Sequence, residues 1–207
     1  MSGIDATTIR PAELDDHQAI ATLLSEAFLH ADLAPWLIAD EDDRARIYPR
    51  YFALLAEQAL ANGHVEMTCD GAGVAVWYIH DGTPIPPLPD YGAQLADITK
   101  PYAARFAALD DTMHRHHPTD EPHHYLALLA VHPADHGGGY GSRLLDHHHA
   151  QLDATGTAAY LEATGYRTDA LYRRHGYQRR QPYLITRDSP VLLPMWRPSS
   201  PKAGERS

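Results

Sequence analysis

The 207-residue chain has 44% hydrophobic and 21% charged residues, which is the composition of one ordinary globular domain. Its formal net charge of −10 argues against a nucleic-acid partner, which needs clustered lysine and arginine, and suits a cationic partner better. The single cysteine, Cys69, excludes a disulfide framework and a cysteine-based zinc site. No apolar run approaches the roughly 18 residues of a membrane span, and the first residues do not read as a signal peptide, so we expect a cytoplasmic protein with no membrane partner.

Helical and strand patterns alternate along the first 80 residues. Apolar residues at three- and four-residue steps predict two helices, the first capped by Asp15 or Asp16 and the second beginning at Pro49, which a first turn tolerates. The pair Asp70-Gly71 is typical of a β-hairpin turn. The predicted elements are a strand ending at 9–11, a helix carrying residues 20–28, a helix from 49 to about 62, and strands over about 64–69 and 73–80.

The rest of the chain continues this alternation after a proline-rich loop. A helical period runs from Leu95 to Met113, and Pro101 must either kink that helix or begin it. The continuous apolar run HHYLALLAV at 123–131 predicts a strand buried on both faces. The elements that follow are a helix ending near residue 154, a strand over AAYLEA, a helix over DALYRRHG, and strands around 178–186 and 191–197.

Strands that alternate with helices around a buried central strand indicate an α/β or α+β layer architecture. In such folds, ligands bind off strand ends, where loops lead into helix N-termini. We expect a single domain over residues 1–197. The last ten residues, PSSPKAGERS at 198–207, have the composition of a disordered tail.

The segment HGGGYGSRLL, residues 136–145, places four glycines in six positions between a predicted strand and a predicted helix. Such a turn directs several backbone N–H groups at one point, where the helix dipole adds positive charge, so it can hold a phosphate. Glycine lets the phosphate approach the backbone and permits positive φ. The segment lacks the Gly-Lys-[Ser/Thr] of a P-loop and does not complete GxGxxG. A purely structural glycine turn is the alternative.

Two stretches, LALLAVHPADHGGGYGSRLL and YLEATGYRTDALYRRHGY, resemble the GNAT superfamily of acetyl-CoA-dependent N-acetyltransferases, and their arrangement is similar to the puromycin-type enzymes of that superfamily. The opening TTIRPAELDD, the VAVW at 74–77 and the closing MWRP extend the resemblance over nearly the whole chain. It implies a mixed, mostly antiparallel sheet of about six to seven strands flanked by helices. It also implies acetyl-CoA as co-substrate and direct acetyl transfer to the amine of a small molecule, such as an antibiotic or a related metabolite.

The resemblance also implies which residues hold the co-substrate. A buried strand would carry the pantetheine arm, the amides of the glycine turn would hold the pyrophosphate, and a later residue would add a hydrogen bond. The turn departs from the family pattern at His136 and Gly138, which replace cationic or amide side chains, so weaker cofactor binding is expected. The implied cofactor-binding residues are Leu129, Ala130, Val131, Gly137, Gly138, Gly139, Tyr140, Gly141, Ser142 and Thr168.

Acetyl transfer to an amine needs a base, because an alkyl amine with a pKa of about 10.4 is mostly protonated at neutral pH. Glu162, in the strand before the acceptor-side loop, is the candidate base, directly or through a water; an ion pair with an arginine is the structural alternative. Tyr172 takes the place of the family's tyrosine that protonates the departing thiolate; a packed aromatic is the alternative. Aromatic side chains of the predicted acceptor pocket, which are core residues in the alternative interpretation, are Phe28, Trp36, Tyr51, Trp77 and Tyr78.

Fifteen histidines raise the question of a metal site. Consecutive helical residues point about 100° apart, so His147, His148 and His149 cannot share one ion, and no metal is expected. The protein is expected to be a monomer or a homodimer. The alternative function is a non-catalytic acyl-CoA-binding sensor or partner subunit, against which the presence of both Glu162 and Tyr172 argues.

Overall fold

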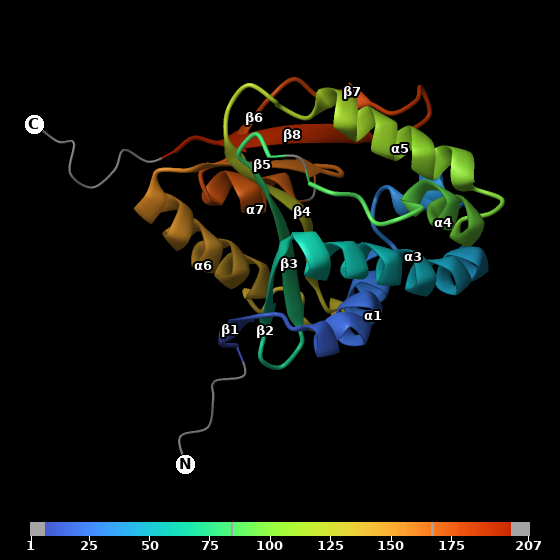
Figure 1. Ribbon diagram of the computed structural model, residues 1–207, viewed down its shortest axis with the longest axis horizontal. Helices are drawn as coiled ribbons and strands as arrows, with labels where there is room; N and C mark the ends of the chain where they lie inside the picture. The colour runs from blue at the N-terminus through green and yellow to red at the C-terminus, as the bar shows by residue number, and fades with distance from the viewer. Residues whose placement is uncertain (1–6, 84, 167, 200–207) are drawn as a thin grey trace, which may run out of the picture.

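A central sheet with helices on both faces forms the framework of the protein (Figure 1). The computed structural model describes residues 7–83, 85–166 and 168–199, so most of the predicted tail lies outside the described residues. The helices are η1 (Leu14–Asp16), α1 (His17–Phe28), α2 (Ala34–Leu37), α3 (Glu41–Asn62), α4 (Tyr91–Ile98), α5 (Ala103–His116), η2 (Pro133–Asp135), α6 (Tyr140–Thr155) and α7 (Asp169–Arg174). The strands are β1 (Ile9–Pro11), β2 (His64–Thr68), β3 (Gly73–His80), β4 (His123–Val131), β5 (Ala158–Ala163), β6 (Gln178–Arg179), β7 (Tyr183–Leu184) and β8 (Val191–Arg197).

The sheet has eight strands in the order β1-β2-β3-β4-β5-β8-β6, with β7 also paired to β8. Every pairing is antiparallel except that of β4 with β5. The prediction of a mixed, mostly antiparallel sheet flanked by helices is confirmed. One predicted strand, 178–186, is instead two short strands, because Pro182 between them has no N–H to give to a ladder.

The two faces of the sheet carry separate cores because side chains alternate along a strand. In β3, Val74 and Val76 pack with residues of α1 to α5, whereas Ala75 and Trp77 pack with residues of α6 and α7. Figure 1 shows these two helical groups on opposite sides of the central strands. Within the described ranges, no helix combines the length and the apolarity of a bilayer-spanning segment.

The predicted start of the second helix was wrong. The helix α3 begins at Glu41 and contains Pro49 in its interior. Its N-terminus is well specified, because the Asp40 side chain accepts a hydrogen bond from the Asp43 backbone N–H at 2.9 Å and three acidic residues occupy the first turn. An interior proline costs about 3 kcal/mol, and the buried residues on both sides of it, which include Ile47, Tyr48 and Phe52, oppose that cost by packing the helix against the sheet.

The helical period predicted from Leu95 to Met113 is divided near Pro101. The helix α4 ends at Ile98, and α5 begins at Ala103. The prediction for β4 was correct in its bounds but wrong in its burial, since residues 127–129 of this strand are only partly buried. The reason is the opening between β4 and β5 that forms the candidate site.

Candidate active site

The strands β4 and β5 pair only along their first residues and then separate. Their register runs over four pairs, from His123–Ala158 to Leu126–Leu161. Beyond this point β4 pairs with β3 alone, while Glu162 and Ala163 pair with β8. A bulge opposite Val76 and Trp77 leaves Ala127 without a register partner and bends β4 at the point of separation. The backbone of β4 after Leu126 therefore has hydrogen-bonding groups that no strand takes on the β5 side.

A cavity of about 300 Å³ occupies this opening on the side covered by α1, α3 and α5. Its wall includes residues 126–129 of β4, residues 161–163 of β5 and the N-terminal part of α7. Most of the remaining wall is apolar or aromatic and includes Phe28, Tyr51 and Met113. Two carboxylates, Asp110 and Glu162, also line the cavity.

One carboxylate oxygen of Glu162 accepts hydrogen bonds, and the other has no partner among the described residues. The hydroxyls of Tyr160 and Tyr183 donate to its Oε1 at 2.8 and 3.2 Å. Its Oε2 is buried and has no hydrogen-bond partner among the described residues. Burial raises the pKa of Glu162, and the tyrosine hydroxyls oppose that rise. A buried carboxylate with a raised pKa and a free oxygen in a cavity wall is suited to accept a proton.

Tyr172 lies on α7 and faces the same cavity. The side chain is only 8% exposed, and burial raises its pKa to about 12. It is therefore protonated at neutral pH and can act as a proton donor but not as a base.

The glycine turn lies beyond the end of β4, at the N-terminus of α6. Gly137 and Gly139 have φ of 85° and 82°, the left-handed region that favours glycine, and a Cβ at either would meet no atom within 4 Å. Gly139 is the N-cap of α6 and has no side chain with which to satisfy the first-turn N–H groups. These amides, of Tyr140, Gly141 and Ser142, are open to an anionic group, and the space beside the glycines admits it.

Side chains of the turn are used to hold it in place. The Tyr140 hydroxyl donates to Asp70 Oδ2 in the β2–β3 hairpin at 2.9 Å, and Ser142 Oγ lies 3.1 Å from His175 Nε2. A Cβ at Gly138 would lie 3.0 Å from the Asp135 carbonyl oxygen, closer than normal contact. A side chain at this position would therefore require the turn to shift by a few tenths of an ångström.

Comparison with known proteins agrees with this geometry. The chain matches the acetyltransferase (GNAT) domain family over residues 103–179, from the start of α5 to β6. A solved structure from Corynebacterium glutamicum, described as histone acetyltransferase HPA2 and related acetyltransferase, is 30% identical with a TM-score of 0.72, over 95% of this chain and 98% of that one. The chain belongs to the GNAT acetyltransferase family.

More distant acetyltransferases share the fold. The ribosomal-protein-S18-alanine N-acetyltransferase from Escherichia coli is 20% identical, with a TM-score of 0.54 over 97% of both chains. The NatC complex bound to Gag peptide and CoA has a TM-score of 0.51 and 12% identity, over 93% of this chain and 98% of that one. The co-substrate of the GNAT fold is acetyl-CoA. The separated strands of this acetyltransferase fit the long, thin thioester arm of acetyl-CoA, and the open glycine turn fits the pyrophosphate to which that arm is joined.

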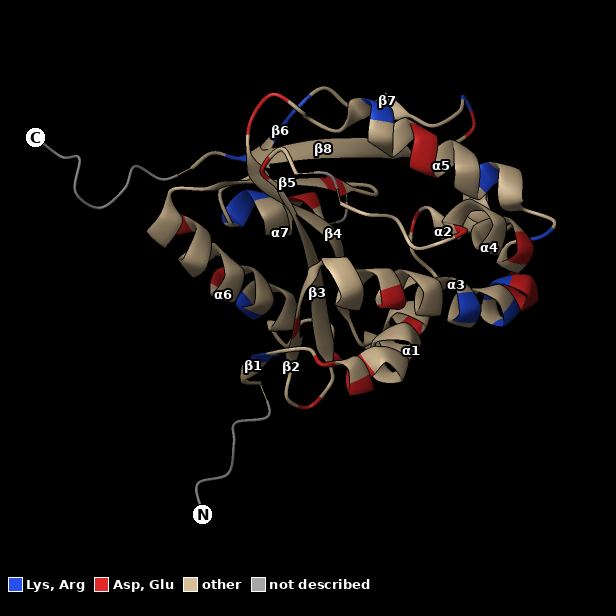
Figure 2. Cartoon of the chain, viewed as in Figure 1, with Lys and Arg blue, Asp and Glu red and all other residues tan. Residues whose placement is uncertain are grey.

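The structure brings most of the predicted site residues to one region. Glu162, Tyr172, Thr168 and Leu129 line the cavity, and the rest of the predicted cofactor-binding set continues along β4 into the turn. Figure 2 shows the lysine and arginine residues of the described chain scattered over several helices and loops and interspersed with acidic ones.

The predicted acceptor-pocket residues divide into two groups. Phe28 and Tyr51 line the cavity, whereas Trp36, Trp77 and Tyr78 are not part of its wall. Trp77 is fully buried on the opposite face of the sheet, where its ring stacks on His148 with centroids 4.0 Å apart. Its position follows from strand alternation, since it shares a face with Ala75 and not with Val76.

Sequence reasoning missed Asp110, which projects from α5 into the cavity wall. Burial raises its pKa to about 6, although a hydrogen bond from the Tyr91 hydroxyl at 3.2 Å opposes the rise. A signal was present, because Asp110 interrupts the apolar stripe of Phe106, Leu109 and Met113. A carboxylate on the buried side of an amphipathic helix is a candidate for binding a cationic group.

Proposed function

We propose that this protein transfers the acetyl group of acetyl-CoA directly to the amine of a small molecule with an apolar or aromatic body. The observation that carries the proposal is the free, buried Oε2 of Glu162 in the wall of a cavity that Tyr172 shares. The cavity lies where β4 and β5 separate, next to the backbone that would bind the pantetheine arm. Glu162 is then placed to remove a proton from the amine, and Tyr172 is placed to give one to the thiolate.

In the proposed mechanism, Glu162 removes a proton from the acceptor ammonium, either directly or through one water. The amine nitrogen then attacks the thioester carbonyl carbon, and the carbon–sulfur bond breaks. Tyr172 gives its hydroxyl proton to the departing thiolate, and the second proton that the acceptor nitrogen loses restores the Tyr172 hydroxyl. The products are an N-acetyl amide and coenzyme A, and Glu162 releases the first proton to solvent. The amides of the glycine turn, those of Tyr140, Gly141 and Ser142 included, hold the pyrophosphate, whereas the Gly138 N–H already donates to the Asp135 carbonyl oxygen at 3.1 Å. Leu129, Ala130 and Val131 hold the pantetheine arm by their backbone.

The acceptor preference follows from the rest of the wall. Phe28 and Tyr51 provide aromatic surface, and Asp110 provides a carboxylate that is ionised above a pH of about 6. An alkyl ammonium ion attached to a flat or aromatic body fits these three side chains. The likeness to the puromycin-type enzymes supports an amino-bearing antibiotic or a related metabolite as the acceptor, and self-protection or tailoring in the cytoplasm as the role.

The test is an acetyl-transfer assay with a panel of amines, read by thiol release and by the mass of the product. Primary alkyl amines that carry an aromatic ring, puromycin included, should give an amine-dependent thiol release and a product heavier by one acetyl group. Linear aliphatic amines of similar size serve as the matched set and should react more slowly. A chain that binds acetyl-CoA but acetylates none of the panel would support the sensor function and contradict this proposal.

A further inference from the structure

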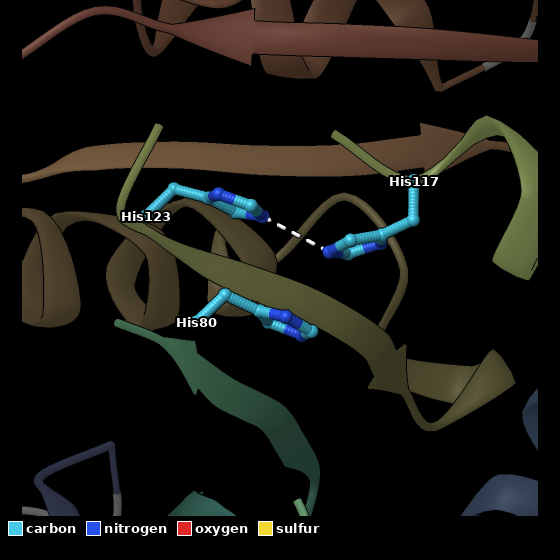
Figure 3. A group of neighbouring side chains, drawn as sticks. All are labelled: His80, His117 and His123. Atoms are coloured by element: carbon cyan, nitrogen blue, oxygen red, sulfur yellow. Dashed lines mark hydrogen bonds between the residues drawn. The ribbon is translucent and has the colours of Figure 1, made fainter. Parts of the chain in front are cut away.

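Three histidines from separate elements meet at the edge of the molecule away from the glycine turn. His80 is the last residue of β3 and His123 the first of β4, and the two are register partners in the antiparallel pair. His117 is the C-cap residue of α5, where the chain leaves the helix toward β4. Figure 3 shows His117 and His123 pointing toward each other, with His80 beside them.

The distances within this group suit a single metal ion. One ring nitrogen from each histidine lies within 4.8 Å of the other two. The Nε2 atoms of His117 and His123 are 3.0 Å apart. Two nitrogens bound to one tetrahedral zinc ion at about 2.0–2.1 Å are separated by about 3.3 Å, so a small rotation of the rings admits the ion.

The hydrogen bonds of His123 leave its inner nitrogen as an acceptor. Its Nδ1 lies 2.8 Å from the carbonyl oxygen of Glu121, and a carbonyl can only accept, so Nδ1 carries the proton. The lone pair is therefore on Nε2, which faces His117. A ligand histidine that donates its outer N–H to a backbone carbonyl is the usual arrangement at metal sites, because that bond fixes the ring and raises its basicity.

The surroundings hold the His117 ring in place. It packs edge-on against Tyr125 and Tyr160, with centroids 4.8 and 5.2 Å apart.

An acid-lined cavity borders two of the three histidines. It has a volume of about 470 Å³, borders His80 and His123 and is lined by Asp81, Asp120 and Glu121. These carboxylates attract cations and give an ion an entry route. Water can complete a tetrahedral set around three imidazoles.

We propose that His80, His117 and His123 bind one divalent transition-metal ion of the zinc class. The ion would tie the end of α5 to the β3–β4 pair, beside Tyr160, whose hydroxyl holds Glu162. The sequence argument against a metal considered histidines that neighbour one another on a helix, whereas strand pairing brings His80 to His123 and the end of α5 brings His117 to both. Imidazole nitrogens favour Zn²⁺, Ni²⁺ or Cu²⁺ over Mg²⁺ or Ca²⁺.

A second group, His64, Glu66 and His148, also has ligand atoms within 4.8 Å of one another. Both ring nitrogens of His148 are engaged, Nδ1 at 3.2 Å from Glu66 Oε1 and Nε2 at 2.9 Å from His124 Nδ1, which is not a member of the group. In the first group, by contrast, the contact between the Nε2 atoms of His117 and His123 is the one that an ion would replace. The network around His148 is explained without an ion, so it serves as the competing site in the test.

The experiment titrates Co²⁺, as a spectroscopic substitute for zinc, into tag-free, chelator-treated full-length protein, and follows visible absorption and heat. We expect one ion per chain and the intense visible bands of a tetrahedral site, reversed by added Zn²⁺. Substitution of a group that only supports a metal ligand lowers metal affinity by about 10- to 100-fold. The variants H80A and H123A remove ligands themselves and should lower it by more. The matched control is H114A, which removes an exposed histidine at the end of the same helix.

Circular dichroism of each metal-free variant separates lost binding from lost folding, and H117Q provides a ligand change that keeps the side chain's bulk. Absence of saturable binding in the folded wild-type protein would overturn the proposal. Binding that H80A, H117Q and H123A leave unchanged, or that only H148A abolishes, would overturn it as well and assign the ion elsewhere. None of these readouts depends on acetyl transfer, so the proposal stands apart from the proposed function.

Discussion

Replacing Glu162 by glutamine tests the proposed base without changing the shape of the site. The amide oxygen can still accept hydrogen bonds from the Tyr160 and Tyr183 hydroxyls, which hold the carboxylate at 2.8 and 3.2 Å. The amide cannot remove a proton. A general base contributes about 10²- to 10⁴-fold in rate, which is about 3–5 kcal/mol of barrier, and E162Q should lose that much in kcat.

The stability of E162Q should change in the opposite direction. Burial raises the pKa of Glu162 above its ordinary value of 4.5, so the wild-type protein loses stability as the pH rises from that ordinary value to the raised pKa, and the loss is constant above it. The neutral glutamine escapes this cost. E162Q should therefore be at least as stable as the wild type at neutral pH, and the difference should grow between pH 4.5 and the raised pKa of Glu162 and then level off.

Glu66 provides the matched control, because it is also a buried glutamate on a strand of the sheet. Burial tends to raise its pKa, but hydrogen bonds from His148 and His64 outweigh burial and lower the pKa to about 2. Its contribution to stability is therefore present above the ordinary pKa and is lost as the pH falls toward 2. E66Q should cost about 1.5–3 kcal/mol in unfolding free energy at neutral pH and leave the pH–rate profile unchanged.

The assay is steady-state acetyl transfer across a pH range, together with thermal unfolding of the same samples. The wild-type rate should fall as the pH drops below the raised pKa of Glu162, which gives the pH–rate profile an acid limb. The profile of E162Q should lack this limb. An E162Q variant with an unaltered kcat and an unaltered acid limb would refute the reasoning, as would an E66Q variant that loses the limb.

Three further substitutions test the other parts of the site. Tyr172→Phe should lower kcat far more than it raises the KM for acetyl-CoA. The control Tyr177→Phe changes a neighbouring ring, with centroids 5.9 Å apart, and should leave kcat unchanged. Equal rates for the two variants would reject the acid role of Tyr172. Gly139 has a φ of 82°, so Gly139→Ala should cost roughly 1–2 kcal/mol in stability and raise the KM for acetyl-CoA. The control is Gly156→Ala at the other end of α6, where φ is 67°. It should lose a similar amount of stability and leave that KM unchanged. Asp110→Asn should raise the KM for the amine and abolish the fall of that KM as the pH rises through about 6; an unchanged KM would remove Asp110 from the acceptor site.

The parts of the site that depend on local backbone chemistry were predictable from the sequence. The strand at 123–131 has the predicted bounds, and the glycine segment forms a turn into a helix with positive φ at Gly137 and Gly139. Both follow from short-range rules, since an apolar run of strand length and a cluster of glycines have few alternative structures.

Features that depend on strand pairing were not predictable from spacing. The bulge at Ala127 and the early end of the β4–β5 ladder are properties of register, and they turn a strand expected to be buried on both faces into the wall of a cavity. The group of His80, His117 and His123 has the same origin, because cross-strand partners can be far apart in the sequence. Trp77 shows the reverse case, in which alternation directs an aromatic side chain to the face opposite the cavity.

The most direct test of the account is a crystal structure of the protein with coenzyme A and an acetylated amine. The account predicts the pyrophosphate on the backbone amides of the glycine turn, the thiol end between β4 and β5, and the product amide within hydrogen-bonding distance of Glu162 Oε2. Coenzyme A bound elsewhere, or an opening between the two strands that the ligands leave empty, would contradict it.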